Sequence, residues 1–427
     1  MPLKFKHEQT NNTQSDWGIA KLGNFIEVET GKRTKGGALS KGKVASIGGE
    51  HIDVQGNIKW SDMKFIPKDF YKLLKQGKVR LGDILLVKDG ATTGKVALTK
   101  DLKYEKVAVN EHVFIIRNKT NRLENEFLFY FLFSDIGQAE IKKRVHGMIG
   151  GIIRKDLSAI PISLPPIKEQ RKIVSILTRI DKVIQRIDEV IMKTEKLKGD
   201  ILQKLFTEGL SHEEFENTKI GKIPKDWKVV RLRKVATHVN SGLTPRGGAS
   251  TYLDQGIPFI RSQNVLMNKL DLSDVAYISP ETHNSMARSS VSPGDLLLNI
   301  TGASIGRVAV LSSSVKEANV NQHVCRIRFR EEITPAFASY YLSTPSGQRQ
   351  IMSFQAGATR QGLNYRQIKS LLLPCPPLSE QQRITEIISA FDDKLELDCK
   401  RRKKFKRIKK GLMNDLFSGK KRIEVAM

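Results

Sequence analysis

The sequence predicts an α+β chain that arose by internal duplication. It contains two tandem globular α/β modules, each followed by a long helix, and the two helices pair as a coiled coil. Three observations support this prediction: phrases along the 427-residue chain recur once at nearly constant spacing, a heptad pattern runs through the helical part, and the stretches before the helices diverge. We therefore expect a shared frame that carries two different modules.

The repeat is clearest in its helical part. The phrase PPIKEQRKI, from Pro165, returns as PPLSEQQRI from Pro376, 376 − 165 = 211 residues later, and the match continues without a gap to Leu205-Phe206 and Leu416-Phe417. Earlier phrases recur at nearly the same spacing: DWGIAKL (16–22) with DWKVVRL (226–232), and VNEHVFIIR (109–117) with VNQHVCRIR (320–328). These anchors predict four parts: a module over 1–160, a helical segment over 161–212, a module over 213–370 and a helical segment over 371–427.

The first helical segment carries apolar residues in alternating steps of three and four, which is the a/d pattern of a coiled coil. Pro165-Pro166 ends the preceding element, and Glu169 favours the dipole of a first helical turn. The predicted seam is Ile173, Ile176, Ile180, Val183, Ile187, Val190, Thr194, Leu197 and Ile201. This seam spans roughly 42 Å, and an apolar seam of that length needs a partner, for which the second helix is the natural choice.

The second helical segment has a less regular seam. Its apolar positions are Ile384, Ile387, Phe391 and Leu395, followed by Phe405, Ile408, Leu412 and Leu416. Between these two groups lie Asp398 and either Arg401 or Arg402. The pairing loosens there, or the charges meet polar partners on the first helix, such as Thr194 if the two run antiparallel; the sequence leaves both open.

The charge balance indicates a polyanionic partner. The chain has 72 Lys and Arg against 45 Asp and Glu, a formal net charge of +27, and basic proteins gain affinity for nucleic acids by releasing counterions. The run KRRKKFKRIKK, residues 400–410, lies on the predicted second helix, so a solvated helix face explains it more simply than a DNA patch or a membrane surface.

Several classes of protein are disfavoured. Cys325, Cys375 and Cys399 lack C-x-x-C spacing, which argues against disulfides and structural zinc. The polar N-terminus has no apolar core of a signal peptide, and no apolar run approaches the ~18–20 residues that cross a bilayer. We therefore expect a soluble cytoplasmic protein that does not bind membranes.

The stretch GDILLVKDGATTGK (82–95) is similar to a phosphate-binding loop, but it departs from that pattern. A P-loop needs four residues between its glycines and a Ser or Thr after its lysine, whereas Gly90 and Gly94 are separated by three residues and Val96 follows Lys95. The phrase returns at 294–307 as GDLLLNITGASIGR, with Arg307 in place of the lysine. A repeated strand–loop–strand scaffold is the simpler interpretation.

The duplicated order of two variable modules, two matched helices beginning P-P-x-x-E-Q, and a basic charge resembles one family. This family is the specificity (S) subunits of type I restriction-modification systems, and the resemblance runs from Asp16 to about Gly419. It implies that each module is a target recognition domain that reads one half of a split, asymmetric DNA sequence. It also implies an antiparallel coiled coil with pseudo-twofold symmetry that sets the unread spacer.

The resemblance further implies the partners. These are double-stranded DNA, two modification (methyltransferase) subunits and two restriction (translocase and nuclease) subunits. S-adenosylmethionine, ATP and Mg are expected on the partner subunits and no cofactor on this chain, which is expected not to be an enzyme. In agreement, the sequence has no N-P-P-Y or D-P-P-Y tetrapeptide, no complete P-loop and no cluster of metal ligands. His112, His323, Asp83 and Asp295 fit hydrogen-bonded structural roles better than acid–base catalysis.

Readers of bases and phosphates are expected on polar loops of the modules. Gly90 and Gly302 are expected to shape loops and not to read bases. The candidates form three groups: Lys32, Arg33, Thr34 and Lys35 with Thr244 and Arg246; Arg261, Ser262, Gln263 and Asn264 with Ser46 and His51; and Arg144, His146 and Arg154 with Gln355, Thr359, Arg360 and Gln361.

Three alternatives remain beside this interpretation. A specificity subunit of a type IIB-like restriction-modification system would have the same sequence features, and only its partner would differ. A nucleotide-binding enzyme would use the Gly90 and Gly302 loops. A basic coiled-coil scaffold for RNA or membranes would explain the charge alone.

Overall fold

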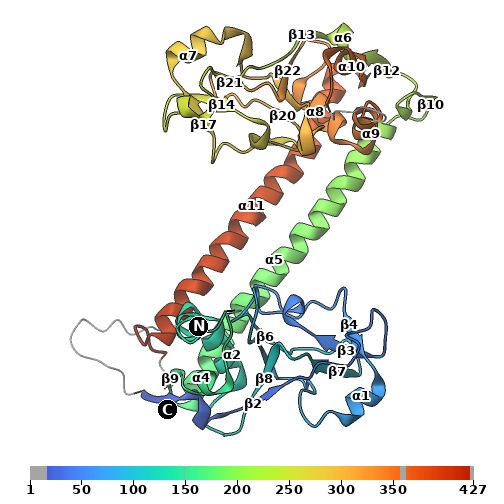
Figure 1. Cartoon of the computed structure of the whole chain (residues 1–427). Helices are drawn as coiled ribbons and strands as arrows, with labels where there is room; N and C mark the ends of the chain where they lie inside the picture. The colour runs from blue at the N-terminus through green and yellow to red at the C-terminus, as the bar shows by residue number, and fades with distance from the viewer. Residues whose placement is uncertain (1–16, 149, 356–361, 424–427) are drawn as a thin grey trace. The chain divides into compact units, whose positions relative to one another are not determined.

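The computed structural model describes residues 17–148, 150–355 and 362–423 (Figure 1). The chain divides into two units, one formed by residues 1–188 and 400–427 and the other by residues 189–399. Each unit therefore contains one α/β module together with a part of both long helices. The predicted α+β class with an internal duplication is confirmed.

The module of unit 1 has two central sheets and a short ribbon. In the four-stranded antiparallel sheet the order is β2-β8-β5-β6, and in the three-stranded mixed sheet it is β4-β3-β7, with β3 and β7 parallel. The strands are β1 (Gly18–Lys21), β2 (Ile26–Thr30), β3 (Val44–Ile47), β4 (Lys64–Ile66), β5 (Ile84–Val87), β6 (Val96–Leu98), β7 (Lys106–Val109), β8 (Val113–Asn118) and β9 (Pro161–Leu164), which pairs with β1. The helices are α1 (Lys68–Leu73), α2 (Asn125–Phe133), α3 (Asp135–Lys142), α4 (Arg154–Ser158) and the long α5 (Ile167–Glu208).

The module of unit 2 repeats this topology. Its sheets have the orders β13-β22-β19-β20 and β17-β14-β21-β18, so β18 is an added edge strand, and β12 pairs with β23 as β1 does with β9. The strands are β12 (Lys228–Arg231), β13 (Ala236–Ser241), β14 (Ile257–Ile260), β17 (Ala276–Ile278), β18 (Ser290–Val291), β19 (Leu296–Asn299), β20 (Val308–Val310), β21 (Ala318–Val320), β22 (Val324–Phe329) and β23 (Leu372–Cys375). Two hairpins join β10 (Phe215–Thr218) to β11 (Gly221–Pro224) and β15 (Val265–Leu266) to β16 (Lys269–Leu270). The helices are α6 (Leu232–Val235), α7 (Pro280–Ser285), α8 (Pro335–Ser343), α9 (Pro345–Ser353), α10 (Tyr365–Ser370) and the long α11 (Leu378–Phe417).

The continuous apolar run of β5 follows from its burial on both faces. Successive side chains of a strand point to opposite faces, and here Ile84 and Leu86 join the core beneath the helices while Leu85 and Val87 join the core between the two sheets. In unit 2, Leu296 and Leu298 of β19 take the first role and Leu297 the second. The GDILLV and GDLLLN phrases therefore belong to the central strand of each module.

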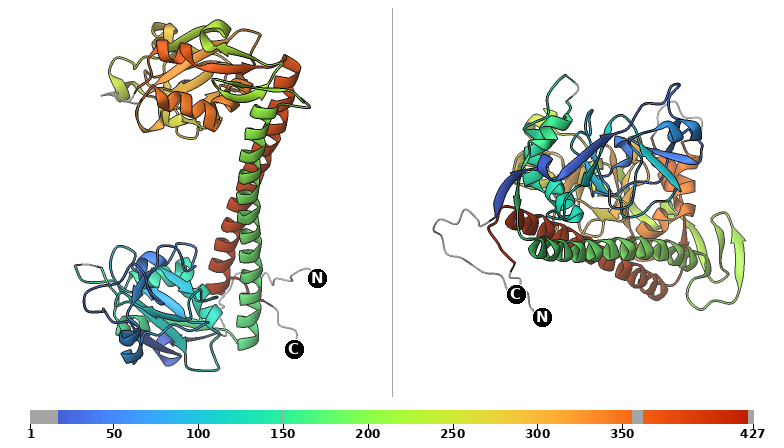
Figure 2. Two further views of the ribbon diagram at one scale, coloured as in Figure 1. Left: turned by 90° about the vertical axis from the view of Figure 1, so that its right-hand side faces the viewer. Right: turned by 90° about the horizontal axis from the view of Figure 1, so that it is seen from below.

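The two long helices run antiparallel within each unit, and both views of Figure 2 show them side by side. In unit 1, Asp181 and Asp188 of α5 pair with Lys409 and Arg402 of α11, at 2.6 and 3.0 Å, so the α11 number falls as the α5 number rises. In unit 2, Lys198 of α5 pairs with Asp392 of α11 at 2.5 Å.

The structure corrects one of the two heptad positions that make up the predicted seam. Val190, Leu197 and Ile408 are 42%, 50% and 43% exposed, so these three residues do not belong to the buried seam. The seam position that the sequence placed at Ile176, Val183 and Ile387 lies one residue later. The buried residues of the observed seam are Ile173, Leu177, Ile184, Ile191 and Leu205 of α5 and Ile384, Ile388 and Leu416 of α11. The other predicted seam residues are half-buried: Ile176, Ile180, Val183, Ile187, Thr194, Ile201, Ile387, Phe391, Leu395, Phe405 and Leu412.

Charged partners accommodate the polar middle of α11, and for Arg402 the partner lies on α5, as in the second of the two possibilities for this stretch. Arg402 takes a half-buried position and pairs with Asp188 of α5, and the buried Lys409 pairs with Asp181. Asp398 is 3% exposed and pairs with Lys394 one turn earlier. Buried charges with partners cost far less than unpaired ones, and they also fix which residues of the two helices face each other.

Candidate nucleic-acid interface

The P-P-x-x-E-Q phrase forms the joint between each module and its own helix. The Gln170 side chain accepts a hydrogen bond from the Glu124 backbone at 2.9 Å and donates to the carbonyls of Arg122 and Pro165, both at 2.9 Å. Gln381 accepts from the Thr334 backbone and donates to Glu332 and Pro376 in the same way. Both glutamines are fully buried, so each one fixes the loop before α2 or α8 on the start of a long helix.

The glutamate of the same phrase binds the segment that follows the other long helix. Glu380, at the start of α11, accepts hydrogen bonds from the Leu210 backbone at 2.8 Å, from His212 at 2.9 Å and from the Trp227 indole at 3.0 Å. In unit 1, Glu169 is 3% exposed and accepts from Arg422 and from the Ile423 backbone. The role of this glutamate is therefore larger than the predicted effect on the helix dipole.

The Leu-Phe pair at the end of each helix enters the module of the other copy. Phe417 of α11 packs on Phe127 and Phe131 of α2, with ring centroids 5.2 and 5.9 Å apart. Phe206 of α5 packs on Phe337 and Tyr341 of α8. Each module is thus held by the start of one long helix and by the end of the other.

A duplicated Tyr–Asp–Lys contact adds a polar link. The Tyr130 hydroxyl donates to Asp181 of α5 at 2.8 Å, and Lys409 of α11 pairs with that carboxylate and lies 5.3 Å from the Tyr130 ring centroid. In unit 2 the same contact is made by Tyr340, Asp392 and Lys198. Burial, then the adjacent Asp181 carboxylate, raises the pKa of Tyr130 well above its ordinary range.

We expect the substitutions Tyr130→Phe and Tyr340→Phe each to lower the free energy of unfolding by about 1.5–3 kcal/mol, the contribution of a hydrogen bond to a charged acceptor. Urea unfolding of the full chain measures this. Tyr104→Phe is the control, because no hydrogen bond of its hydroxyl is found among the described residues. Equal stability of all three variants would contradict the assignment.

The first and third groups of candidate readers in unit 1 lie at one end of its four-stranded sheet, where a chain of contacts connects four loops. Arg33 lies 3.8 Å from Glu111, and the two ring nitrogens of His112 lie 3.4 Å from Glu111 and 2.5 Å from Asp89. Asp89 forms a backbone bridge with Gly151. We call this region, residues 31–35, 88–95, 110–112, 144–148 and 150–154, the loop edge of unit 1.

The loop edge of unit 2, residues 242–248, 300–306, 321–323 and 362–364, is connected at equivalent positions by different chemistry. Thr244 donates to Gln322, and the Gln322 amide lies 3.2 Å from His323. His323 lies 2.6 Å from the Thr301 hydroxyl, and Thr301 forms a backbone bridge with Gly362. Neutral side chains thus occupy the positions that Arg33, Glu111 and Asp89 occupy in unit 1, so the two edges share a frame and present different surfaces.

The structure brings the first and third predicted groups together at these edges. Lys32, Arg33, Lys35, Arg154, Thr244 and Arg246 are exposed there. Arg144 is half-buried, because its guanidinium pairs with Glu140 at 2.6 Å and donates to the Glu140 carbonyl. His146 pairs with Asp156 at 2.7 Å. Thr359, Arg360 and Gln361 lie outside the described residues.

Three of the residues predicted to contact DNA are buried in the structure. Thr34 is 8% exposed, Ser46 is 6% exposed within β3, and Asn264 is 2% exposed. The Asn264 side chain instead accepts from the Arg261 backbone and donates to the carbonyls of Asp271 and Asp274. The Asn264 side chain therefore holds its loop in place.

The rest of the second group is accessible only in part. Arg261 donates to the Asp274 carbonyl at 3.0 Å and lies 5.7 Å from the Tyr252 ring centroid. Ser262 is half-buried and Gln263 is exposed. The counterpart of this group in unit 1, His51, is 3% exposed and accepts from the Gly48 backbone.

Sequence reasoning missed Lys88, Asp89, Glu111 and Gln322, which lie at the two loop edges. The repeated V-N-x-H-V phrase was the available signal, because Asn110 and Asn321 each accept a hydrogen bond from the backbone of the histidine two residues later. That turn points residues 111 and 322 to the loop edge. Asp83 and Asp295 have structural roles, since they pair with Arg117 and Arg328 at 2.7 and 2.6 Å.

The glycine loops do not have the fold of a P-loop. A P-loop leads from a strand into a helix, whereas the loop after β5 leads into β6, an antiparallel neighbour of the same sheet, and β19 and β20 do the same. Gly90 and Gly302 have φ values of +90° and +71°, which glycine adopts readily. Gly302 forms the first residue of a short 3-10 turn before β20.

Other chemistry is limited within the described part of the chain. No group of three or more His, Cys, Asp and Glu side chains there could hold a metal ion. Burial raises the pKa of the Cys325 thiol to about 12, which keeps that thiol protonated and unreactive. Among the same residues, no helix has the length and apolar character of a membrane span.

Comparisons with known proteins agree with the architecture. The family model for the type I restriction modification DNA specificity domain matches residues 14–193 and again residues 224–407. The chain is 26% identical to the type I restriction enzyme MjaVIII specificity subunit of Methanocaldococcus jannaschii, over 98% of this chain and 96% of that one. It is 27% identical to the Escherichia coli EcoBI specificity subunit over 55% of this chain and 52% of that one.

Solved structures show the same fold. The S subunit of a type I restriction-modification system from M. genitalium superimposes with a TM-score of 0.60 at 16% identity, covering 96% of this chain and 98% of that one. A chain from a study of complex assembly and conformational transition of the type I R-M system gives 0.58 at 19% identity, covering 96% and 99%. Two family matches that together span most of the sequence, one on each module and its helix, show that the chain belongs to the DNA specificity subunits of type I restriction-modification systems.

Proposed function

We propose that this chain is the non-catalytic reader of a type I restriction-modification complex, in which each module reads one half of an asymmetric, bipartite DNA target. One observation carries the proposal: the two loop edges are connected at equivalent positions, but through Arg33, Glu111 and Asp89 in unit 1 and through Thr244, Gln322 and Thr301 in unit 2. A common frame with different polar groups suits two readers of different base sequences.

The long helices supply the second part of the proposal. Helices of 42 and 40 residues whose facing positions are fixed by ion pairs suit a ruler for the unread spacer. Regular spacing of two readers on one duplex requires such a rigid connection. The helices also offer long surfaces for two methyltransferase subunits, and two restriction subunits complete the proposed complex. S-adenosylmethionine, ATP and Mg belong to those partners, and the cytoplasm is the proposed location.

Selection of binding sites from random duplex DNA by the chain with its methyltransferase subunits tests the proposal. We expect a target of two dissimilar halves separated by a spacer of fixed length. Binding to random duplex that is as tight as binding to any selected target, at physiological salt, would overturn the proposal.

Single arginine substitutions test the two modules separately. Arg154→Ala and Arg246→Ala remove exposed cations from the loop edges of units 1 and 2. We expect each variant to relax base preference in one half-site only, with a loss of about 1–3 kcal/mol of binding if the arginine reads a base. If the arginine holds a phosphate, affinity falls equally for all sequences and the salt slope falls by about 1. Relaxed preference in both halves from one variant would contradict the assignment of one module to one half.

A further inference from the structure

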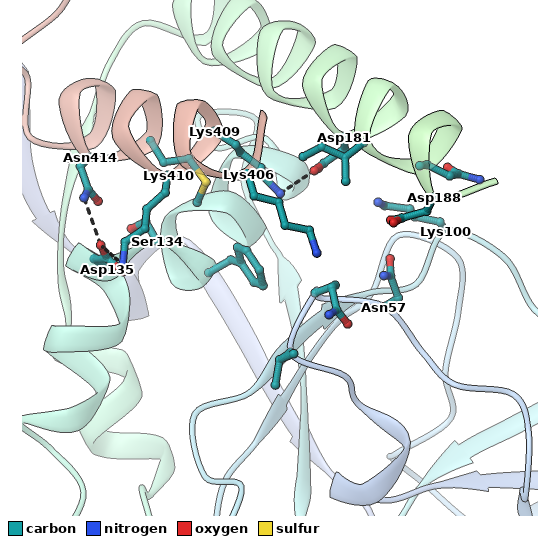
Figure 3. A pocket seen from close by; sticks show the side chains of 16 residues that line it. Asn57, Lys100, Ser134, Asp135, Asp181, Asp188, Lys406, Lys409, Lys410 and Asn414 are labelled. Atoms are coloured by element: carbon teal, nitrogen blue, oxygen red, sulfur yellow. Dashed lines mark hydrogen bonds and ion pairs between the residues drawn. The ribbon is translucent and has the colours of Figure 1, made fainter. Parts of the chain in front are cut away.

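Unit 1 contains a basic cavity between its module and the long helices. Its volume is about 670 Å³, and Figure 3 shows side chains that line it from α2 and α3, from the loops before β4 and after β6, and from α5 and α11. The residues that matter here are Asn57, Lys100, Asp181, Lys406, Lys409 and Lys410. None of them belongs to a loop edge.

Each carboxylate in this cavity already has a cation. Asp181 pairs with Lys409 at 2.6 Å, Asp188 pairs with Arg402 at 3.0 Å, and Asp135 pairs with Lys410 at 3.2 Å. Lys100 and Lys406 remain. Both are exposed, and neither has an ion pair within the described ranges. Figure 3 shows the Lys406 ammonium group directed into the cavity on the side of Asn57.

The positive potential of these two lysines acts on their neighbour. Burial is the main cause that lowers the pKa of Lys409, the Asp181 carboxylate opposes this effect, and the charges of Lys100 and Lys406 lower the pKa further. Lys100 and Lys406 therefore both repel the Lys409 ammonium group, although they come from the loop after β6 and from α11. An anion would relieve that repulsion.

The duplication shows that the frame does not need the two lysines. The Tyr–Asp–Lys contact recurs in unit 2, but Glu195 takes the place of Lys406 (406 − 211 = 195), and Ser312, two residues after β20, takes the place of Lys100, two residues after β6. At the module–helix contact of unit 2, Lys269 pairs with Glu396 at 3.3 Å. The cations of unit 1 are thus an addition to a joint that is complete without them.

We propose that this cavity binds a backbone phosphate of the DNA that the chain recognises, outside the loops that read bases; the inference rests on the proposed function. Lysine binds a phosphate as a compact point charge, and a contact to phosphate positions the duplex without reading its sequence. The site continues along one face of α11, since Lys403 and Lys410 lie three and four residues from Lys406 and Arg407 lies four residues from Lys403. All three are exposed. A continuous row of cations suits a polyanion better than a small ion.

The test measures DNA affinity against salt for the full chain with its methyltransferase subunits. The double variant Lys100→Gln/Lys406→Gln is expected to make the decrease of log affinity with log salt less steep, by about 1 in slope. We also expect it to weaken binding roughly 5-fold at about 0.15 M salt, equally for target and unrelated duplex. Base preferences stay unchanged. The matched control, Lys193→Gln/Lys196→Gln, removes two exposed lysines of α5 in unit 2 and leaves the slope unaltered.

Further variants and measurements distinguish DNA from other ligands of the cavity. Ser312→Lys/Glu195→Lys, which builds the two cations into unit 2, is expected to raise the slope. If the Lys100→Gln/Lys406→Gln variant has the same salt dependence as the control variant, the inference is wrong. The proposed function still holds in that case if the parent chain binds its target selectively. If the parent chain binds inorganic phosphate and this variant does not, while the salt dependence of DNA binding is unchanged, the cavity binds a small anion. Loss of methyltransferase subunits from the purified variant would assign it to an acidic protein surface. Either result would overturn the DNA assignment.

Discussion

Replacing Phe417 with alanine should lower the free energy of unfolding of unit 1 by about 3–5 kcal/mol, the usual cost of removing a buried aromatic ring. Phe417 is 6% exposed, and its ring packs on those of Phe127 and Phe131 in the module of unit 1. Phe206→Ala should act in the same way on unit 2, where the ring is 5% exposed. Urea unfolding, with hydrogen exchange to locate the change, measures both effects.

The control for Phe417→Ala is Ile408→Ala on the same helix. Ile408 is 43% exposed, and substitutions at such positions usually change stability by no more than about 0.5 kcal/mol. A large effect at Ile408 would restore the sequence-predicted seam. A small effect at Phe417 would show that the module does not depend on the end of α11.

The second large effect is expected at Glu380. Alanine there removes the acceptor of three donors, the Leu210 backbone, the His212 ring and the Trp227 indole. The Trp227 indole is buried, and the other two donors are half-buried. A buried donor left without a partner costs about 1–3 kcal/mol and a half-buried one less, so we expect a loss of about 2–4 kcal/mol in the free energy of unfolding. Glu380→Gln keeps part of the acceptor and should fall between the parent chain and the alanine variant.

Glu386→Ala provides the matched comparison one and a half turns along α11. Glu386 pairs with Arg383 at 3.1 Å, and its side chain is 65% exposed, so its removal should cost no more than about 1 kcal/mol. Thermal unfolding distinguishes the two glutamates. Similar losses for Glu380→Ala and Glu386→Ala would contradict the joint described at the start of α11.

The internal repeat predicted the frame because both copies share their backbone anchors. The choice of seam residues failed where adjacent positions were equally apolar: Ile176 and Leu177, or Val183 and Ile184, satisfy the heptad spacing alike. The lysine at 198 then made the correct series look broken, although this side chain is half-buried and pairs with Asp392. A polar residue with a partner on the facing helix cannot be recognised from one helix alone.

The candidate site was predictable only as groups of residues. The polar loops of Arg33 and Arg154 are visible in the sequence, but the contacts that join these loops involve Glu111, His112 and Asp89, which lie far from both in sequence. Ser46 was misplaced because its loop-like polar character gave no sign of its pairing within β3. Side-chain contacts between distant loops require coordinates.

The joints at Glu169 and Glu380 make two places in the chain equivalent. Arg422 and Ile423, near the C-terminal end, contact Glu169, whereas Leu210 and His212, between the two copies, contact Glu380. Either copy could therefore come first: a gene cut between the copies and rejoined through the original ends would encode every one of these contacts. The contacts at the joints therefore do not require a particular order of the two modules in the chain. We expect the rearranged polypeptide to select the same DNA.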